Sequence, residues 1–237
     1  MFLEKAMKTK ENEKSRIEEA YRSIKRLMLH RKIVPGQKLL YRELIDLLHM
    51  SKTPIINALN RLEQEGFILS ENNRGYTVKP IDPQEILDAY EVREALEVKA
   101  VQQAVIKGKP ADRAILEEKF RAYEAYSPPR MDQKKWILDA EFHLQIAEMS
   151  GNKVLKYLLR RNFEHVLLRT DLKHYASERR VSSSKEHEKL LKSILEEDIS
   201  SSCDLMRQHV RNSGNAMMKT LLQEEENELE SMTFFEE

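Results

Sequence analysis

The stretch PGQKLLYRELIDLLHMSKTPIINALNRLEQEGFI, residues 35–68, decides the fold of the first third of the chain. It opens on a Pro-Gly turn, and the residues after it follow helical spacing over about 41–48. A second helix is expected to start near Lys52, with Ser51 as its cap, and to stop at Gly66. Two helices joined by so short a turn are typical of a helix-turn-helix. The leucines expected to face inward on the first of them are Leu40, Leu44, Leu47 and Leu48.

The flanking segments complete a larger unit. Upstream, apolar residues from Ile17 to Met28 predict a helix that ends near Arg31. Downstream, residues 67–70 and 76–80 read as two short strands around a turn. Three helices followed by a β-hairpin form a winged helix-turn-helix, which places its third helix in the DNA major groove. We therefore assign residues 1–80 to a winged helix-turn-helix DNA-binding domain.

The distribution of charge agrees with this assignment. The 237 residues hold 40 Lys+Arg and 40 Asp+Glu, so the net charge alone says nothing about partners. Residues 1–80, however, carry a net charge of +6, and residues 81–237 a net charge of −6. This asymmetry favours a nucleic-acid-binding N-terminal part joined to a domain with another role.

The expected third helix offers residues that can read DNA. An Asn can bond adenine through two hydrogen bonds, and a Thr or Ile can contact the thymine methyl group. Basic side chains can meet phosphates. The alternative is an ordinary solvated helix face, but the fold pattern, the positive charge and an exposed Ile in a polar face together favour DNA. The candidates are Arg42, Lys52, Thr53, Ile56, Asn57, Asn60 and Arg74.

Residues 15–80 resemble the DNA-binding domain of GntR-type bacterial transcription regulators. The family pattern runs PG-x-x-L, then S-[RK]-T-P-V-R-E-A-L, then a wing ending in R-G, which this chain matches with NNRGYTV at 72–78. The resemblance implies that Arg42 and Lys52 contact DNA and that Gly75 belongs to the wing. The family's Arg-Glu after Pro-Val is replaced here by Ile56-Asn57. An expected DNA-contacting Arg is therefore absent, so either the operator differs or specific binding is weaker.

The rest of the chain reads as helices after a junction at about 79–82, where Asp82 can cap and Pro83 suits a first turn. Six helices without strand signals predict an antiparallel α-bundle over residues 81–230, so the whole fold is mainly α. Ser183 and Glu186 have the spacing of a capping box. The helices are expected at about 83–107, about 111–126, across 139–149, at about 153–173, after 174–184, and from near Asp198 to about 225.

Polar residues on apolar helix faces suggest a metal site. Asp139 and His143 lie one turn apart beside Trp136, Ile137, Ala140, Leu144 and Ala147, and His187 and His209 lie on the apolar faces of two later helices. A lone buried His usually bonds a carbonyl or water, yet four such groups desolvated separately would be costly. If they converge, one divalent Zn, Ni, Fe or Mn ion explains them all. Such an ion leaves coordination positions open for water or an anionic ligand.

Residues 83–222 look like the all-helical FCD ligand-sensing domain of the FadR subfamily within the GntR group. The marks are YEVREALE at 90–97, D-x-x-FH at 139–143, SGN at 150–152, EH at 186–187 and the His of MRQH at 206–209. The resemblance implies that the metal ligands are Asp139, His143, His187 and His209. Acyl-CoA-binding members of the family lack this set, so the resemblance argues against a fatty-acyl effector. It also places Arg93 near the effector pocket. Arg93 could instead be a surface residue paired with Glu97, and Asn152, a second effector candidate, could be only a helix cap.

These features predict a metabolite-responsive transcription regulator. It would be a homodimer that binds a pseudo-palindromic double-stranded DNA operator and responds to a small carboxylate. One alternative is a DNA-binding protein with a purely structural metal and no effector. Another is a metal-dependent enzyme, but no convincing general base lies beside the proposed ligands and the DNA-binding half would be unexplained.

The remaining sequence features concern the compartment. Cys203 is the only cysteine, which excludes an intramolecular disulfide and favours a reducing compartment. The N-terminal residues lack the apolar run of a signal peptide, and no later segment is long and apolar enough to span a bilayer. We therefore expect a cytoplasmic protein that makes no membrane contact.

Overall fold

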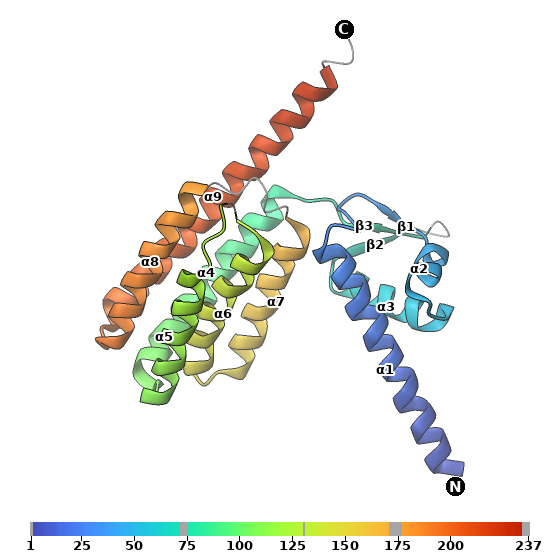
Figure 1. The fold of residues 1–237 in the computed structure, drawn as a ribbon, viewed down its shortest axis with the longest axis horizontal. Helices are drawn as coiled ribbons and strands as arrows, with labels where there is room; N and C mark the ends of the chain where they lie inside the picture. Colours follow the sequence, from blue (N-terminus) through green and yellow to red (C-terminus); the bar gives the residue numbers. More distant parts are fainter. Residues whose placement is uncertain (1, 72–74, 130, 171–176, 234–237) are drawn as a thin grey trace. The chain divides into compact units, whose positions relative to one another are not determined.

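The computed structural model describes residues 2–71, 75–129, 131–170 and 177–233 (Figure 1). The chain divides into two compact units, Met1–Ile81 and Asp82–Glu237. The fold is mainly helical, a winged helix-turn-helix followed by an all-helical bundle, which confirms the predicted fold class. Among the described residues no helix combines the length and the apolar composition that crossing a membrane requires.

The first unit contains three helices and a small antiparallel sheet. Strand β3 lies between β1 and β2, with Leu39 and Ser70 both opposite Tyr76. The two-residue strand β1 was not predicted, because so short a segment carries no alternation of its own. The elements are α1 Phe2–Leu29, β1 Lys38–Leu39, α2 Tyr41–Leu48, α3 Lys52–Gln64, β2 Ile68–Glu71 and β3 Gly75–Val78.

Helix α3 packs against α1 through a stripe at helical spacing. Ile55, Leu59 and Leu62 are all fully buried, and Ile24 of α1 lies in the same core. Ser51 stands at the N-cap as expected, but its side chain makes no capping hydrogen bond. A cap oxygen bonds the N–H of the second or third helical residue, and the third residue here is Pro54, which has no N–H. The pattern therefore located the helix correctly but not its capping contact.

The wing depends on a glycine. Gly75 has φ +102°, and a Cβ at this position would lie 3.0 Å from the carbonyl oxygen of Leu39. Both the backbone conformation and the close approach of β1 therefore favour glycine. The predicted phosphate contact Arg74, immediately before it, lies outside the described residues.

The second unit is a helical bundle built around α4, which packs against α6, α7 and α9 (Figure 1). Gly214 allows α9 to approach α4 closely, since a Cβ there would lie 3.2 Å from Tyr90 side-chain atoms. Asp82 caps α4 by accepting a hydrogen bond of 2.9 Å from the backbone N–H of Gln84. The helices are α4 Pro83–Lys107, α5 Pro110–Ala125, α6 Gln133–Met149, α7 Lys153–Arg169, α8 Ser177–Leu195 and α9 Ile199–Thr233.

Three details of the bundle differ from the expectations. Helix α8 begins at Ser177, so Ser183 lies inside the helix and is buried instead of capping it. Ser182 Oγ donates a hydrogen bond of 3.0 Å back to the Arg179 carbonyl, so this serine is accommodated within the helix and does not end it. Ile137, on the apolar side of its predicted helix, and Ala95, which follows the apolar spacing of the helix predicted at about 83–107, were both expected to face inward but are exposed. Phe142 and Ile146 are fully buried residues of α6 instead, because α6 packs against α4, α5 and α7 at once.

Replacing Leu59 by Ala should destabilise the first unit. The side chain is fully buried on α3, and removing such a Leu side chain costs about 2–5 kcal/mol. Native-state hydrogen exchange of the α1 and α3 amides would measure this loss. The control is Asn57→Ala on the exposed side of the same helix, which should change the opening free energy by less than about 0.5 kcal/mol. Equal effects of the two substitutions would contradict the packing described.

Candidate metal centre and nucleic-acid interface

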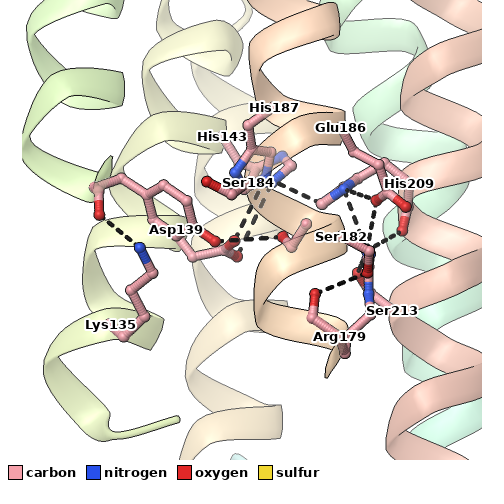
Figure 2. A network of polar contacts seen from close by, with 12 residues as sticks. Lys135, Asp139, His143, Arg179, Ser182, Ser184, Glu186, His187, His209 and Ser213 are labelled. Atoms are coloured by element: carbon pink, nitrogen blue, oxygen red, sulfur yellow. Dashed lines mark hydrogen bonds and ion pairs between the residues drawn. The ribbon is translucent and has the colours of Figure 1, made fainter. Parts of the chain in front are cut away.

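Four side chains from three helices meet inside the bundle. Helix α6 supplies Asp139 and His143, α8 supplies His187 and α9 supplies His209, as Figure 2 shows. One potential ligand atom from each lies within 4.8 Å of all the others, and all four residues are buried. The structure thus brings together the four residues selected from the sequence, and their binding of a metal remains a prediction.

The spacing of the donor atoms suits a transition metal. His187 Nε2 lies 3.1 Å from His143 Nε2, 3.2 Å from His209 Nε2 and 3.5 Å from Asp139 Oδ1. Metal–nitrogen bonds of about 2.0–2.1 Å, at angles between octahedral and tetrahedral, separate neighbouring donor nitrogens by about 2.9–3.4 Å. Both nitrogen–nitrogen distances from His187 fall within this range, and the four donors together form a group that could hold one ion.

Two carboxylates orient the outer nitrogens of the rings. His143 Nδ1 is hydrogen-bonded to Glu97 Oε2, and His209 Nδ1 lies 2.7 Å from Glu186 Oε2. Carboxylate partners favour a proton on Nδ1, which leaves the Nε2 lone pairs of these two rings facing the centre of the cluster. Lone pairs facing each other at this distance repel unless a proton or a cation lies between them. A metal ion between these nitrogens would accept their lone pairs and remove the repulsion.

Each of these carboxylates is itself held by an arginine. Arg93 Nε donates to Glu97 Oε1 at 2.5 Å, and Arg179 Nη2 donates to Glu186 Oε2 at 2.7 Å. Arg179 also donates to Ser213 Oγ at 2.8 Å and so ties α8 to α9 (Figure 2). Two chains of contacts, Arg93–Glu97–His143 and Arg179–Glu186–His209, thus reach the cluster from different helices.

The protonation states favour metal binding. Burial alone would raise the pKa of Glu97, but the neighbouring His143 and Arg93 outweigh it and hold that pKa at about 2. Burial would likewise raise the pKa of Glu186, while His209 and Arg179 bring it to about 2. Burial lowers the pKa of His209 to about 4 against the opposing effect of Glu186, and lowers the pKa of His187 well below its usual value. Both rings are therefore neutral near pH 7, the form that ligates metals.

Two alternatives were considered for Arg93, a place near the effector pocket and an ion pair with Glu97, and the structure has features of both. Arg93 pairs with Glu97 as expected for residues four apart, yet it is buried and not on the surface. Its Cζ lies 4.2 Å from the ring centroid of Phe163, and Nη2 lies 3.9 Å from Asp139 Oδ2. Among the described residues this Nη2 has no hydrogen-bond partner. A buried guanidinium donor beside the cluster is thus available to an anionic ligand.

Asn152 lies elsewhere. It is exposed, and its Oδ1 accepts a hydrogen bond of 3.1 Å from the backbone N–H of Leu155, which caps α7. His143 is buried more than a turn inside the end of α6. The placement of Asn152 therefore supports the capping role and gives no support to effector binding.

Sequence reasoning missed four residues around the cluster. Glu97 was considered only as a surface partner of Arg93, and Glu186 only as part of a capping box. Arg179 carried no signal, because its partners lie on another helix. Lys135, one turn before Asp139, is buried with Nζ 2.5 Å from the carbonyl oxygen of Tyr123. In the sequence, the only sign of these residues was a pair of opposite charges four residues apart, Lys135 with Asp139 and Arg93 with Glu97.

The described candidate DNA-contacting residues lie at the surface of the first unit, and Arg74 lies outside the described residues. Arg42, on α2, is exposed, and Ile56 is half-buried where the sequence suggested full exposure. A hydrogen bond from Arg42 and the charge of Lys52 lower the pKa of the Tyr41 phenol, which indicates a positive local potential. Tyr76 of the wing donates a 2.8 Å hydrogen bond to Asn60 Oδ1, so one acceptor of Asn60 is engaged. The exposed candidates on α3 are Lys52, Thr53, Asn57 and Asn60.

A winged helix-turn-helix combined with an all-helical ligand-binding domain defines a class of DNA-binding transcription regulators and not of enzymes. The chain belongs to the gntR family of bacterial regulatory proteins, whose family model matches residues 16–78, and the FCD domain model matches residues 88–212. Both matches agree with the resemblances noted from the sequence.

Relatives and solved structures agree with this family. The chain is 31% identical over 132 residues to the Nta operon transcriptional regulator of Aminobacter aminovorans, covering 56% of this chain and 62% of that protein. It is 28% identical over 206 residues to the HTH-type transcriptional repressor GlaR of Escherichia coli K12, covering 81% and 91%. The fold matches E. coli McbR/YncC with a TM-score of 0.68 at 20% identity, covering 87% of this chain and 98% of that one. The last match supports the fold alone.

Replacing Glu97 by Gln should weaken metal binding by about 10- to 100-fold, because the carboxylate that orients His143 would be lost. Competition against a chromophoric chelator, with Zn²⁺ and Ni²⁺ as probes, measures the affinity. Glu94→Gln is the matched control, since Glu94 lies on the same helix but pairs with Arg211. Unchanged affinity in the Glu97 variant would show that this contact does not support a metal ligand.

Proposed function

We propose that this protein is a cytoplasmic, homodimeric transcription regulator whose affinity for a pseudo-palindromic operator changes when a small organic acid binds at a divalent metal. Asp139, His143, His187 and His209 would hold the metal, with Zn, Ni, Fe and Mn as candidate ions. When bound, the metal would supply a Lewis-acidic position for a carboxylate oxygen. The observation that carries the proposal is the buried, incompletely bonded Arg93 guanidinium beside this donor set.

The charges around the cluster favour an anionic ligand. Three carboxylates, Asp139, Glu97 and Glu186, are matched by three cations, Arg93, Arg179 and Lys135, and the imidazoles considered above are neutral. With the rings of His187 and His209 neutral, the charge of a divalent ion would add to a set of fixed charges that is already balanced. Uncompensated buried charge is costly, and a ligand with one or two carboxylates removes that cost.

Helix α4 offers a covalent route from the ligand to the DNA-binding unit. It carries Arg93 and Glu97 and begins at Pro83, two residues after the first unit ends at Ile81. A ligand changes DNA binding only through its different affinity for two arrangements of the protein. Ligand contacts with Arg93 that shift α4 would change the spacing of the two recognition helices, which must match half-sites about 34–36 Å apart.

Lys52→Ala and Arg42→Ala should weaken DNA binding on all sequences. Each contacting side chain that is lost should reduce the slope of log K against log salt by about one, because fewer counterions are released. Fluorescence anisotropy at several salt concentrations measures the slope. Asn57→Ala serves as the comparison, since it should alter sequence preference and leave the slope unchanged. An unchanged slope in both basic variants would refute their phosphate contacts.

His187→Ala should separate DNA binding from its regulation. The free variant should bind operator nearly as the parent does, because His187 lies in the second unit, but should lose its response to organic acids. Operator affinity is measured with and without a panel of mono-, di- and tricarboxylates after metal loading. A variant that still responds normally would show that the cluster is not the switch. A parent stabilised by metal but by no acid in thermal-shift assays would favour a purely structural metal.

A further inference from the structure

Trp136, the only tryptophan of the chain, lies on the side of α6 that carries the candidate metal ligands. It precedes Asp139 by three residues and His143 by seven, a spacing that keeps side chains on one side of a helix. The side chain is only 3% exposed, so the protein encloses the indole ring. Packing explains the ring itself, but the polar nitrogen of the ring needs a separate account.

The indole nitrogen of Trp136 is a buried donor without an acceptor. Across the part of the chain that the structure describes, Nε1 has no hydrogen-bond partner and is out of reach of bulk water. An indole N–H can only donate, and a buried tryptophan usually finds an acceptor for it. A donor left unsatisfied in this way destabilises the protein, and an acceptor brought by a ligand would remove that cost.

Phe163 of α7 links this donor to a second one. The ring centroids of Trp136 and Phe163 lie 6.4 Å apart with the rings at 76°, and Arg93 Cζ lies 4.2 Å from the Phe163 centroid. Arg93 Nη2 also has no hydrogen-bond partner among the described residues. The ring of His143 lies 5.8 Å from that of Phe163. Two unsatisfied buried donors therefore border one phenyl ring that packs against the cluster.

An N–H contact with the face of the Phe163 ring is the alternative that the protein itself offers to Trp136. Such contacts are weak compared with a hydrogen bond to a charged oxygen. They also give no account of the unsatisfied guanidinium nitrogen of Arg93 beside the same ring. A single ligand with an acceptor at each end would satisfy both donors.

We propose that the indole N–H of Trp136 binds the second carboxylate of a short dicarboxylic acid whose first carboxylate binds at the metal and Arg93. This names the ligand class of the proposed function and rests on it. Trp136 precedes Asp139 by about 4.5 Å along the helix axis. With carbon–carbon bonds of about 1.5 Å, two or three methylene groups separate two carboxylates by about 4–5 Å. A monocarboxylic acid of equal length would place a methyl group against the N–H and leave it unsatisfied.

Charge also favours two carboxylates over one. Arg93, Arg179 and Lys135 match the carboxylates around the cluster in number, so a divalent ion adds two positive charges to a balanced set. One carboxylate cancels one of them, and a second carboxylate cancels the other. The N–H of Trp136 would give this second group a charge-assisted hydrogen bond without adding a further positive charge.

Two matched pairs of probes test the ligand class. Succinate and butyrate differ only at one end of a four-carbon chain, and glutarate and valerate differ in the same way with five carbons. Isothermal titration calorimetry of the full-length, metal-loaded parent should show at least about 10-fold tighter binding of the dicarboxylate in one pair or both. Because Trp136 is the only tryptophan, its fluorescence reports binding at this residue, and the dicarboxylate should change the emission more.

Two replacements test the donor. Trp136→Phe should weaken binding of the preferred dicarboxylate by about 10-fold and leave binding of its monocarboxylate unchanged. Incorporation of β-(3-benzothienyl)alanine at the single tryptophan position keeps the shape of the ring and replaces only the N–H by sulfur, so it should have the same effect. Tyr157→Phe, at a 61% exposed position on α7, is the matched control and should change neither affinity. Equal circular dichroism and metal affinity would show that each protein is folded.

The outcomes separate this inference from the proposed function. Equal affinities within both pairs of probes would overturn the dicarboxylate class, and undiminished dicarboxylate binding by the benzothienyl protein would overturn the role of Trp136. The proposed function stands in both cases. A metal-loaded parent that binds none of the mono-, di- and tricarboxylates tested would overturn the proposed function and this inference together.

Discussion

His143 directs one ring nitrogen to the buried carboxylate of Glu97, and His209 directs one to the half-buried carboxylate of Glu186. These two contacts decide what the centre of the bundle can contain. Glu97 and Glu186 are ionised because Arg93 and Arg179 lie beside them, so the rings turn their other nitrogens toward His187 and Asp139. Three helices must then converge on one point with polar groups facing each other. Helix α6 packs against α4, α5 and α7, while α8 and α9 pack against each other and against α4, so α4 connects the helices that carry the cluster.

Helix α4 connects most features of the second unit. It carries the buried residues Arg93 and Glu97 toward the cluster, while Asp88, Val92 and Lys99 of the same helix are exposed. Its first turn begins two residues beyond the winged helix-turn-helix. In the proposed function, the binding of a ligand at the cluster and the connection to the DNA-binding unit would thus involve the same helix. A small movement of such a helix can couple these processes without a separate relay.

The first unit meets a different constraint, because its function requires polar residues on the surface and a core small enough for about eighty residues. Ile55, Leu59 and Leu62 fill that core from α3, which leaves Lys52, Thr53 and Asn57 on the solvent side. Gly75 lets the wing pass close to β1, and Tyr76 ties the wing to α3 through Asn60. Recognition helix and wing therefore form one relatively fixed surface, which limits the entropy lost on binding DNA.

The sequence by itself determined the fold class and most helix positions, since apolar spacing, Asp82, Pro83 and the Pro-Gly turn act locally. It also singled out Asp139, His143, His187 and His209, because polar residues on apolar helix faces are visible in the periodicity. Only the tertiary structure decided which side chains support them. Glu97, Glu186 and Arg179 contact partners on other helices. Ile137 and Ala95 are exposed because the neighbouring helices, and not the apolar spacing of a helix itself, decide which of its sides is covered. Contacts between segments distant in the chain leave no periodic trace, so the network around the cluster could be seen only in three dimensions.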